Sequence, residues 1–553
     1  MQWRQAVVKI KTQILFFVNI SFDKKINIGN MLNVKITLSK IKGVPPPMKN
    51  SIRTVIVSTI LLAIFSCTTS TDIPLPITTA SGDALEMYNK AWYYWGDHDA
   101  IKQSEYMKKA LEIDPDFILA NLYVVENDPN QRKQFRDRAT QNKNDGSDAE
   151  RLLVEMFIAG REGRTSDQIS LGESLVEKYP NSSKAYVDLG DAYNVTRDFS
   201  SAAQNYKKAT DINPNNVNAW WRLASQHINV YNNQILLPAN KQDKILGIKY
   251  IDKMISLRPE AAVGYQIRGN VERASSNFES AKKWYEQSLE KRRAVGRAAS
   301  GLLGVIAHNL VFNGEFDSAQ EHYNLGIREA QTATAKFSVA IFQIQSYLFN
   351  DDYSGAIKVA DQILKDLETY GFSEVQIYQN KAQIELRKFL AYAYNQKKEE
   401  AYESLMMRKY YAEQAMAKME VDEVIQRNFD TNNAQYQAWY HILFGEYNKA
   451  ETQLNALYSI VSKIQSPTAL DHYSAMMGMV RLFQGDSAGS LSYFNENIDT
   501  ENYQYYSYFK ALALRSAGKD VVARDIFNKI ANYNFNGLGA SLVRSLAKKQ
   551  LGS

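Results

Sequence analysis

The chain of 553 residues has a single cysteine, Cys67, so no disulfide can form within it. Its six histidines are scattered, and none has a cysteine partner or a spacing that would pair two imidazoles on zinc. The chain also lacks the HExxH helix of zinc proteases and the glycine-rich phosphate loop of nucleotide-binding folds. We therefore expect no enzymatic activity, no metal and no cofactor.

Most of the chain has no excess of basic residues. The formal charge is +5, but residues 1–66 hold ten Lys or Arg and one acid, Asp23. The rest has 55 basic and 59 acidic residues, which is a net charge of minus four. Because no basic field remains there, we expect no nucleic-acid partner.

No apolar run is long enough to span a bilayer comfortably. The most apolar stretch, residues 54–65, is about a dozen residues long, whereas a spanning helix needs about 20. Met48 offers a second start, and Lys49 and Arg53 supply a short positive region ahead of the apolar stretch. This order is typical of a signal peptide, which we place at residues 48–66.

The tetrad of Ile64, Phe65, Ser66 and Cys67 resembles the lipobox of bacterial lipoproteins. In that family a small residue precedes the cysteine that receives lipid, and Ile64 and the bulkier Phe65 depart from the commonest pattern. The resemblance implies lipid on Cys67 and a bacterial membrane lipoprotein, in the outer membrane by preference, that faces the periplasm or the cell exterior. Acyl chains would anchor such a protein to one membrane leaflet.

Two segments without repeat character flank the signal peptide. Residues 1–47 are basic, and we interpret them as an upstream extension from a misplaced start codon. Residues 67–82 are rich in Thr, Ser and Pro, which predicts an extended and flexible tether that is unable to pack.

The stretch from Ala185 to Asn216 predicts a hairpin of two antiparallel helices. Large and small residues recur on one face of each helix, and Pro214 ends the second helix because proline lacks the amide donor. The first face carries Tyr186, Leu189, Gly190 and Tyr193, and the second carries Ala202, Tyr206 and Ala209. The small residues let the two backbones approach while the aromatic rings fill the space beside them.

This hairpin resembles the tetratricopeptide repeat, and related stretches recur along residues 83–537, most clearly over 149–330. The resemblance implies an all-α, right-handed superhelical solenoid of ten or eleven hairpins. Residues 231–243 form an insertion between two helices, which we expect to be a dispensable surface loop, and we expect an extra helix or loop within 116–147. Residues 538–553 read as an amphipathic helix that caps the exposed end.

In the repeat family, set positions of each first helix line a concave groove that binds a protein or peptide. Carried over to this chain, those positions are Lys184, Asp191, Asn194, Asn218, Trp221, Gln266, Asn270, Arg273 and His308. Amides and an arginine among aromatic rings suit an extended peptide or a carboxylate. Trp220 and Trp221 are about 100° apart on one helix, so we expect Trp220 to pack inside the hairpin and Trp221 to face the groove.

Two other functions remain open. Glycan-binding outer-membrane lipoproteins of the SusD type also carry tetratricopeptide-like helices behind a lipid anchor, and an exposed aromatic platform in a loop would favour that function. A cytoplasmic regulator would require the signal peptide to be illusory. The aromatic runs at 92–95 and 503–509 we interpret as packing residues, because this repeat family uses Tyr and Trp in its core.

Overall fold

The computed structural model describes residues 72–231, 236–496 and 504–552. The predicted extension, signal peptide and lipidated cysteine lie outside these residues, as does part of the predicted insertion. The described chain contains 25 α-helices, α3 to α27, and two short 3-10 helices. Within this part, no helix has both the length and the apolar composition needed to cross a membrane.

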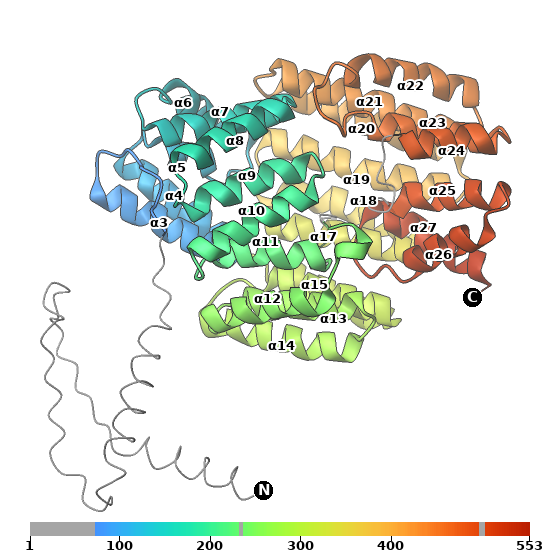
Figure 1. The fold of residues 1–553 in the computed structure, drawn as a ribbon. Coiled ribbons are helices and arrows are strands. Elements are labelled where there is room, and N and C mark those ends of the chain that lie inside the picture. The colour runs from blue at the N-terminus through green and yellow to red at the C-terminus, as the bar shows by residue number, and fades with distance from the viewer. Residues whose placement is uncertain (1–71, 232–235, 497–503, 553) are drawn as a thin grey trace, which may run out of the picture. The chain divides into compact units, whose positions relative to one another are not determined.

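The helices form a series of antiparallel hairpins, so the expected all-α solenoid of paired helices is confirmed (Figure 1). Eleven regular hairpins are present among the described residues, which agrees with the predicted ten or eleven. Their helix pairs are α3 (Gly82–Gly96) with α4 (Ala100–Ile113), α7 (Asp148–Glu162) with α8 (Thr165–Lys178), α9 (Ser183–Val195) with α10 (Phe199–Ile212), α11 (Val217–His227) with α12 (Lys244–Leu257), α13 (Ala262–Ala274) with α14 (Phe278–Ala294), α15 (Ser300–Asn313) with α16 (Phe316–Arg328), α17 (Ala333–Phe349) with α18 (Tyr353–Asp366), α19 (Glu374–Tyr394) with α20 (Lys398–Ala417), α21 (Glu423–Leu443) with α22 (Tyr447–Val461), α23 (Asp471–Phe483) with α24 (Ser487–Glu496), and α25 (Gln504–Ser516) with α26 (Asp520–Ala531).

The segment at 116–147 interrupts this series, as expected. It holds the short helix α5 (Ile118–Tyr123) and the helix α6 (Pro129–Gln141), which Asp128 caps by accepting bonds from the first backbone amides. The 3-10 helices are η3 (Ala239–Lys241) and η4 (Leu367–Tyr370). The final helix is α27 (Leu538–Leu551).

In two hairpins a small residue lies in close contact with an aromatic ring of the second helix. At Gly190 on α9, an added Cβ would lie only 2.5 Å from Cε1 of Tyr206 on α10. Gly269 has the same relation to Tyr285 in the α13/α14 hairpin, at 2.4 Å. Both tyrosines are fully buried. The predicted pairing of small and aromatic residues is therefore confirmed, and any side chain at Gly190 would displace a core ring.

The turn inside ten of the eleven hairpins has one left-handed residue, two positions before the second helix. Five of these residues are glycines, at 163, 314, 445, 485 and 518. The other five are His98, Arg197, Ser276, Asp351 and Gln396, with φ between 51° and 60°. The left-handed conformation costs a residue with a Cβ about 1–2 kcal/mol.

Four of the five non-glycine turn residues make contacts with distant parts of the chain. Asp351 accepts hydrogen bonds from Ser545 Oγ at 2.6 Å and Lys549 Nζ at 3.3 Å, both on α27. Ser276 Oγ lies 2.9 Å from Asn534 Nδ2, and Arg197 pairs with Asp471 on α23. His98 contacts the rings of Trp221 and Tyr231.

Gln396 differs, because its side-chain amide reaches only Ala393 O of its own turn, at 3.5 Å. We expect Gln396→Gly to raise the free energy of unfolding by up to about 1 kcal/mol, since relief of the turn exceeds the entropy glycine adds to the unfolded chain. Asp351→Gly is the matched control. It relieves the same conformation but loses both contacts with α27, so urea unfolding should show less stabilisation or a loss. A destabilised Gln396→Gly protein would contradict this interpretation.

Residues 72–81 do not form the unpacked tether that the composition predicts. Leu75 is buried, and Asp72 accepts hydrogen bonds from the backbone and hydroxyl of Ser183 at 2.7 and 2.8 Å. Thr78 N donates to Glu150 at 3.0 Å, and Ala80 N donates to Asp114 at 2.9 Å. The segment is extended but docked along the loops and helix starts of successive hairpins. The composition correctly predicted that this segment has no helix or strand, but it did not predict the hydrogen bonds between the segment and the helical array.

The insertion at 231–243 is not a dispensable surface loop at its ends. Leu237 is buried, and its backbone amide donates to Gln226 O at 2.8 Å. Tyr231 packs on Trp221 with ring centroids 6.2 Å apart. Both ends therefore cover core residues, and the tolerance of the array to removal of the insertion stays a prediction.

Hairpins far apart in the sequence also contact each other. Asp97, after α3, is buried and accepts from Arg258 at 2.8 Å and Arg297 at 3.4 Å. Arg161 of α7 pairs with Asp422, which caps α21, and Thr165 of α8 donates to Gln465 O at 3.1 Å. The predicted cap α27 packs on α17 as well as on its neighbours α25 and α26. It therefore joins two parts of the array rather than only closing its end.

Candidate functional site

The predicted groove residues fall into two groups with different surroundings. Those on α9 and α11 lie at or beside a cavity of about 250 Å³, and those on α13 and α15 are covered by the chain itself. The cavity is lined by Trp92, Trp95, Tyr123, Lys184, Val187, Asp188, Asp191, Asn216, Asn218 and Arg222, and we call it the N-terminal pocket. Lys184, Asp191 and Asn218 were predicted as groove residues.

A lysine lies over two aromatic rings at the wall of the N-terminal pocket. Lys184 Nζ is 4.9 Å from the ring centre of Trp92 and 5.0 Å from that of Tyr123. It also lies 2.9 Å from both carboxylate oxygens of Asp188, one helical turn further along α9. Burial raises the pKa of the Asp188 carboxyl, and the nearby Lys184 ammonium opposes that rise. The ammonium is thus held between an anion and two ring faces.

A second charge pair crosses from α9 to α11. Arg222 Nε and Nη2 each lie 2.6 Å from one oxygen of Asp191, which is the bidentate geometry of strong guanidinium–carboxylate pairs. The Tyr206 hydroxyl donates to the same carboxylate at 2.6 Å. Asn194 then donates to the Tyr206 oxygen at 2.5 Å and accepts from Gln226 at 3.0 Å. Asn194 therefore belongs to the supporting network and does not line the pocket.

Several pocket residues were missed by the sequence reasoning. Arg222 and Asp188 lie outside the positions carried over from the repeat family. Trp92 and Trp95 were interpreted as core, yet both line the pocket, and Trp95 is 38% exposed. The core interpretation holds for the second aromatic run, where Tyr505, Tyr506, Tyr508 and Phe509 are buried. The sequence could not distinguish the roles of Trp92 and Trp95 in the WYYW run. Trp92 packs against the core of the first hairpins, whereas the more exposed Trp95 lies at the edge of the pocket.

Trp221 is not an open groove residue. Its indole packs against His98 with ring centroids 5.1 Å apart and against Tyr231 of the insertion, and its Nε1 is buried. Trp220 packs as expected, since its Nε1 donates to Pro214 O at 2.9 Å and its ring meets Tyr250. The predicted distinction between the two indoles is therefore wrong, because the first hairpin and the insertion both cover Trp221.

The groove predicted on α13 and α15 is filled by the chain's own C-terminal segment, residues 532–537. Asn270, Arg273 and His308 are only 2%, 3% and 6% exposed. Asn534 Nδ2 donates to Arg273 O at 3.1 Å, and Asn536 Nδ2 lies 2.7 Å from His308 Nε2. The ring of Phe535 lies 5.3 Å from the Arg273 guanidinium.

The remaining predicted groove residues on α13 also have internal partners. Asn270 donates to Val230 O at 2.8 Å and accepts from the Tyr285 hydroxyl at 2.9 Å. Gln266 accepts from Arg292 at 3.4 Å. The prediction of an open ligand groove over Asn270, Arg273 and His308 is therefore wrong. Arg273 and His308 do contact an extended segment, but that segment is residues 532–537 of the same chain.

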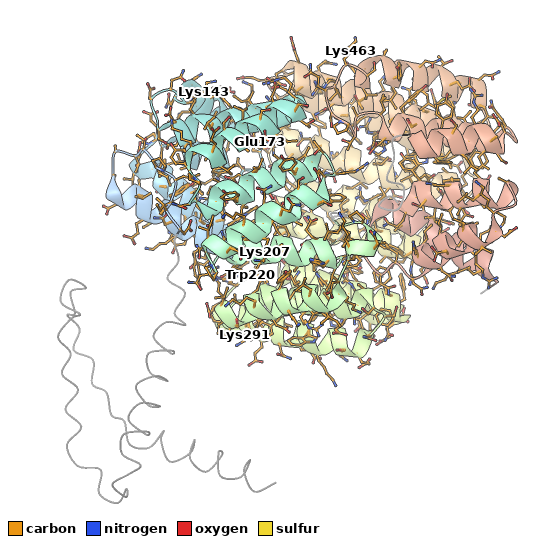
Figure 2. The ribbon with its side chains drawn as sticks, in the orientation of Figure 1. Lys143, Glu173, Lys207, Trp220, Lys291 and Lys463 are labelled. Carbon is orange, nitrogen blue, oxygen red and sulfur yellow. The ribbon has the colours of Figure 1, made fainter. Side chains whose placement is uncertain are left out.

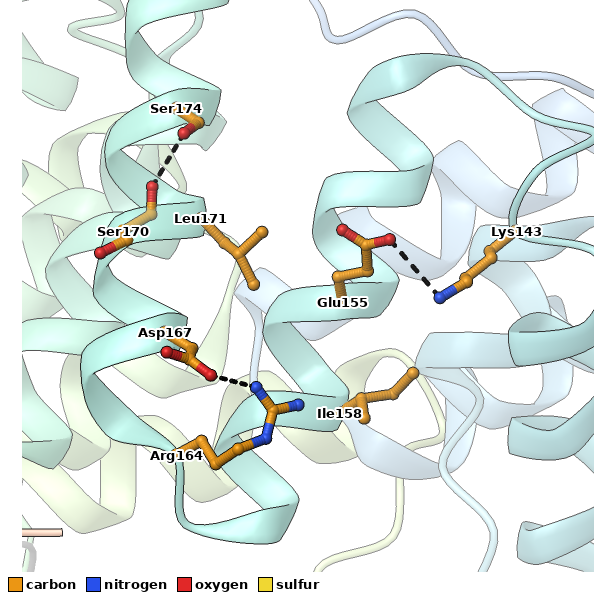
Figure 3. A pocket seen from close by; sticks show the side chains of 8 residues that line it. All are labelled: Lys143, Glu155, Ile158, Arg164, Asp167, Ser170, Leu171 and Ser174. Carbon is orange, nitrogen blue, oxygen red and sulfur yellow. Dashed lines mark hydrogen bonds and ion pairs between the residues drawn. The ribbon is translucent and has the colours of Figure 1, made fainter. Parts of the chain in front are cut away.

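A charged pocket next to the second hairpin has its charges paired with one another. A cavity of about 510 Å³ lies between α7 and α8 (Figure 3). Its Lys143 pairs with Glu155 at 3.4 Å, and its Arg164 pairs with Asp167. The Ser174 hydroxyl donates to Ser170 O at 2.9 Å. Its charges are paired and no aromatic side chain lines it, so it lacks the exposed tryptophan surface that the N-terminal pocket has.

The histidines are used in packing and in local hydrogen bonds. His227 Nδ1 accepts from the backbone of Asp243 at 3.1 Å, and His441 bonds Glu446 at 2.6 Å. Within the described residues, no group of three or more His, Cys, Asp or Glu side chains could hold a metal ion.

Paired helices with left-handed turns and small-to-aromatic contacts define an α-helical repeat protein. Residues 87–117 and 183–216 match the tetratricopeptide repeat family. These two segments therefore resemble tetratricopeptide repeats, and the other hairpins extend them into a longer array of paired helices.

Solved structures of other repeat proteins can be superimposed on parts of the chain. A tetratricopeptide repeat protein from Parabacteroides merdae is 12% identical, covers 55% of this chain and 99% of its own, and has a TM-score of 0.30. The tetratricopeptide repeat domain of P58(IPK) is 11% identical, covers 67% of this chain and 98% of its own, and has a TM-score of 0.21. Neither superposition is close enough to place a ligand on this chain. No curated protein sequence matches it.

Proposed function

We propose that this protein is a membrane-anchored scaffold that binds a segment of a partner protein in the N-terminal pocket. The observation that supports this most is the pocket wall itself, where Lys184, Asp191 and Arg222 present fixed charges beside the half-open indole of Trp95. Fixed charges give register and specificity to a bound peptide, and a partly exposed tryptophan supplies contact area at low entropic cost.

The same contacts favour a peptide over a glycan. Stacking on a sugar needs a free aromatic face, and the Lys184 ammonium already lies over Trp92 and Tyr123, which leaves Trp95 as the exposed ring of the pocket. These aromatic residues also lie on α3 and α5 rather than in a long loop. The SusD-like alternative therefore has less support than peptide binding.

Site-specific photocrosslinking in cells tests the proposed function. A photoreactive phenylalanine at Asn218, which lines the pocket, should form a crosslink to a discrete protein partner. The matched control is the same residue at Lys207 on the second helix α10, whose side chain is 54% exposed (Figure 2). A crosslink at Asn218 that is absent at Lys207 supports the pocket. Equal labelling at both positions, or none at Asn218, would exclude this pocket as the binding surface.

Membrane attachment through Cys67 is the second part of the proposal. Its support is the charged start, the apolar run and the small residue that precede the only cysteine. We expect Cys67→Ser to move the protein from the detergent phase to the aqueous phase in a phase-partition experiment, because acyl chains supply the membrane affinity. Thr71→Ser, which leaves the cysteine and the rest of its tetrad unchanged, serves as the control. Unchanged partition of Cys67→Ser would rule out the lipid anchor and favour the cytoplasmic alternative.

A further inference from the structure

A second groove crosses α17, α19 and α21 and does not involve any residue predicted from the sequence. It consists of two cavities, of about 410 and 290 Å³, on either side of α19. Both cavities are lined by the side chains of Gln379 and Gln383, so they are neighbours along this helix. We call the two cavities together the α19 groove.

The lining of the α19 groove is neutral except for two arginines. Primary amides and apolar side chains make up most of the wall, and no Asp or Glu contributes to it. The amides are Asn127, Gln376, Gln379, Asn380, Gln383 and Asn432. The charged residues are Arg387 in the first cavity and Arg408 in the second. The only charges that a molecule bound in this groove would meet are therefore positive.

Both guanidinium groups are buried and bonded only to neutral atoms. Arg387 is 9% exposed, and it donates to Gln345 Oε1 at 2.9 Å and to Gln383 O at 2.9 Å. Arg408 is 8% exposed, donates to Asn433 Oδ1 at 2.6 Å and lies 4.4 Å from the ring centre of Tyr436. Among the described residues, no carboxylate lies within 4.0 Å of either group.

Burial leaves these charges poorly compensated. Desolvation lowers the pKa of Arg387 to about 10 and also lowers the pKa of Arg408, while the Tyr436 phenol opposes both shifts. Asp97 and Arg258 form a buried pair of opposite charges. Buried Arg273, which has no such pair in the described part of the chain, is covered by the ring of Phe535. A buried cation without an anion costs stability, so its presence beside a cavity indicates a missing anionic partner.

The apolar part of the groove limits the size and character of that partner. The first cavity is flanked by Phe337, Phe342 and Phe372, and the second by Leu386, Met416, Met419, Ile425 and Phe429. Amides hydrogen-bond a peptide backbone well, and unbranched methionines adapt to different side chains. This combination fits an extended chain in which acidic and apolar side chains alternate.

We propose that the α19 groove binds an acidic peptide segment of a partner, with carboxylates paired to Arg387 and Arg408. This site is separate from the N-terminal pocket, so either proposal can fail without the other. The binding is reversible and electrostatic, and it places two acidic side chains where the fold leaves two guanidinium groups without counter-ions.

Isothermal titration calorimetry measures the binding of three synthetic hexapeptides to the full chain. Ac-Leu-Glu-Leu-Glu-Leu-Glu-NH2 is the acidic probe, its glutamine version is the neutral control, and its lysine version is the basic control. We expect the acidic probe to bind at least tenfold more tightly than either control and to weaken as salt is raised. Equal binding of the glutamine and glutamate peptides would overturn the proposal. Equal binding of free glutarate and the acidic peptide would overturn the assignment to a peptide.

Substitutions then locate the site. Arg387→Gln and Arg408→Gln should each weaken the acidic probe about tenfold, whereas Arg481→Gln, a surface residue paired with Glu451, should leave its affinity unchanged. Loss of binding in the Arg481 variant alone would place the site elsewhere.

A stability measurement separates a binding role from a structural role. Arg387→Met removes the buried charge while it keeps the side-chain bulk, so the melting temperature should stay the same or rise as acidic-probe binding falls. A marked fall in the melting temperature with retained affinity would show that Arg387 serves only to hold Gln345.

Discussion

Phe535→Ala should lower the free energy of unfolding by about 3–5 kcal/mol, the usual range for loss of a buried phenylalanine. Phe535 is 4% exposed, and its ring packs on Tyr533 and under the Arg273 guanidinium. Its removal leaves a void beside Arg273 of α13 and weakens the contacts of residues 532–537 with that helix. Equilibrium unfolding in urea, monitored by circular dichroism, measures the change.

Phe483→Ala is the matched control, because that ring is 41% exposed at the end of α23. We expect it to cost less than half as much. If the two substitutions were equally mild, residues 532–537 would not occupy the groove in solution. The predicted peptide site on α13 and α15 would then be open after all.

Acidification should destabilise the protein between pH 6.5 and about 4. Burial lowers the pKa of His98 to about 4, with Arg222 and Arg292 adding to the effect, and burial beside Arg197 lowers the pKa of His472 to about 4. In this window the unfolded imidazoles, with pKa values near 6.5, bind protons that the folded ones do not. Stability is therefore complete above pH 6.5 and is lost as pH falls. The loss is about 3 kcal/mol for His98 and smaller for His472, because solvent screens the exposed His472 residue.

The double variant His98→Gln and His472→Gln tests this assignment. Glutamine retains a hydrogen-bonding side chain but does not titrate, so the variant should lose less stability than the wild type between pH 7 and pH 4. Thermal unfolding at a series of pH values gives the comparison. An identical pH dependence in both proteins would show that other groups, such as the paired carboxylates, account for the whole acid effect.

Local features of the array could be predicted from sequence because they repeat. Gly190 and Tyr206 meet as expected, since their spacing within one hairpin fixes their relation. Lys184, Asp191 and Asn218 line a cavity for the same reason, because the register of a first helix determines which side chains share a face.

Contacts between distant segments could not be predicted in this way. Asp72 with Ser183, and Asn534 with Arg273, depend on where the array brings segments more than 100 residues apart. The repeat pattern of the sequence carries no information about contacts between such distant segments. The sequence around Asn534 has the composition of an ordinary loop, and Arg387 occupies a helix position that an exposed arginine could equally take.

The left-handed turns have a consequence for how the array unfolds. A solenoid whose repeats touch only their neighbours melts gradually from its ends, because each interface contributes separately. Here the turn residues His98, Arg197, Ser276 and Asp351 connect their hairpins to partners up to 274 positions away, as Arg197 does with Asp471. Such cross-links make end fraying costly, so hydrogen exchange should show one cooperative unit across these hairpins. In this protein, the contacts of the left-handed turn residue therefore determine whether a hairpin unfolds alone or together with the others.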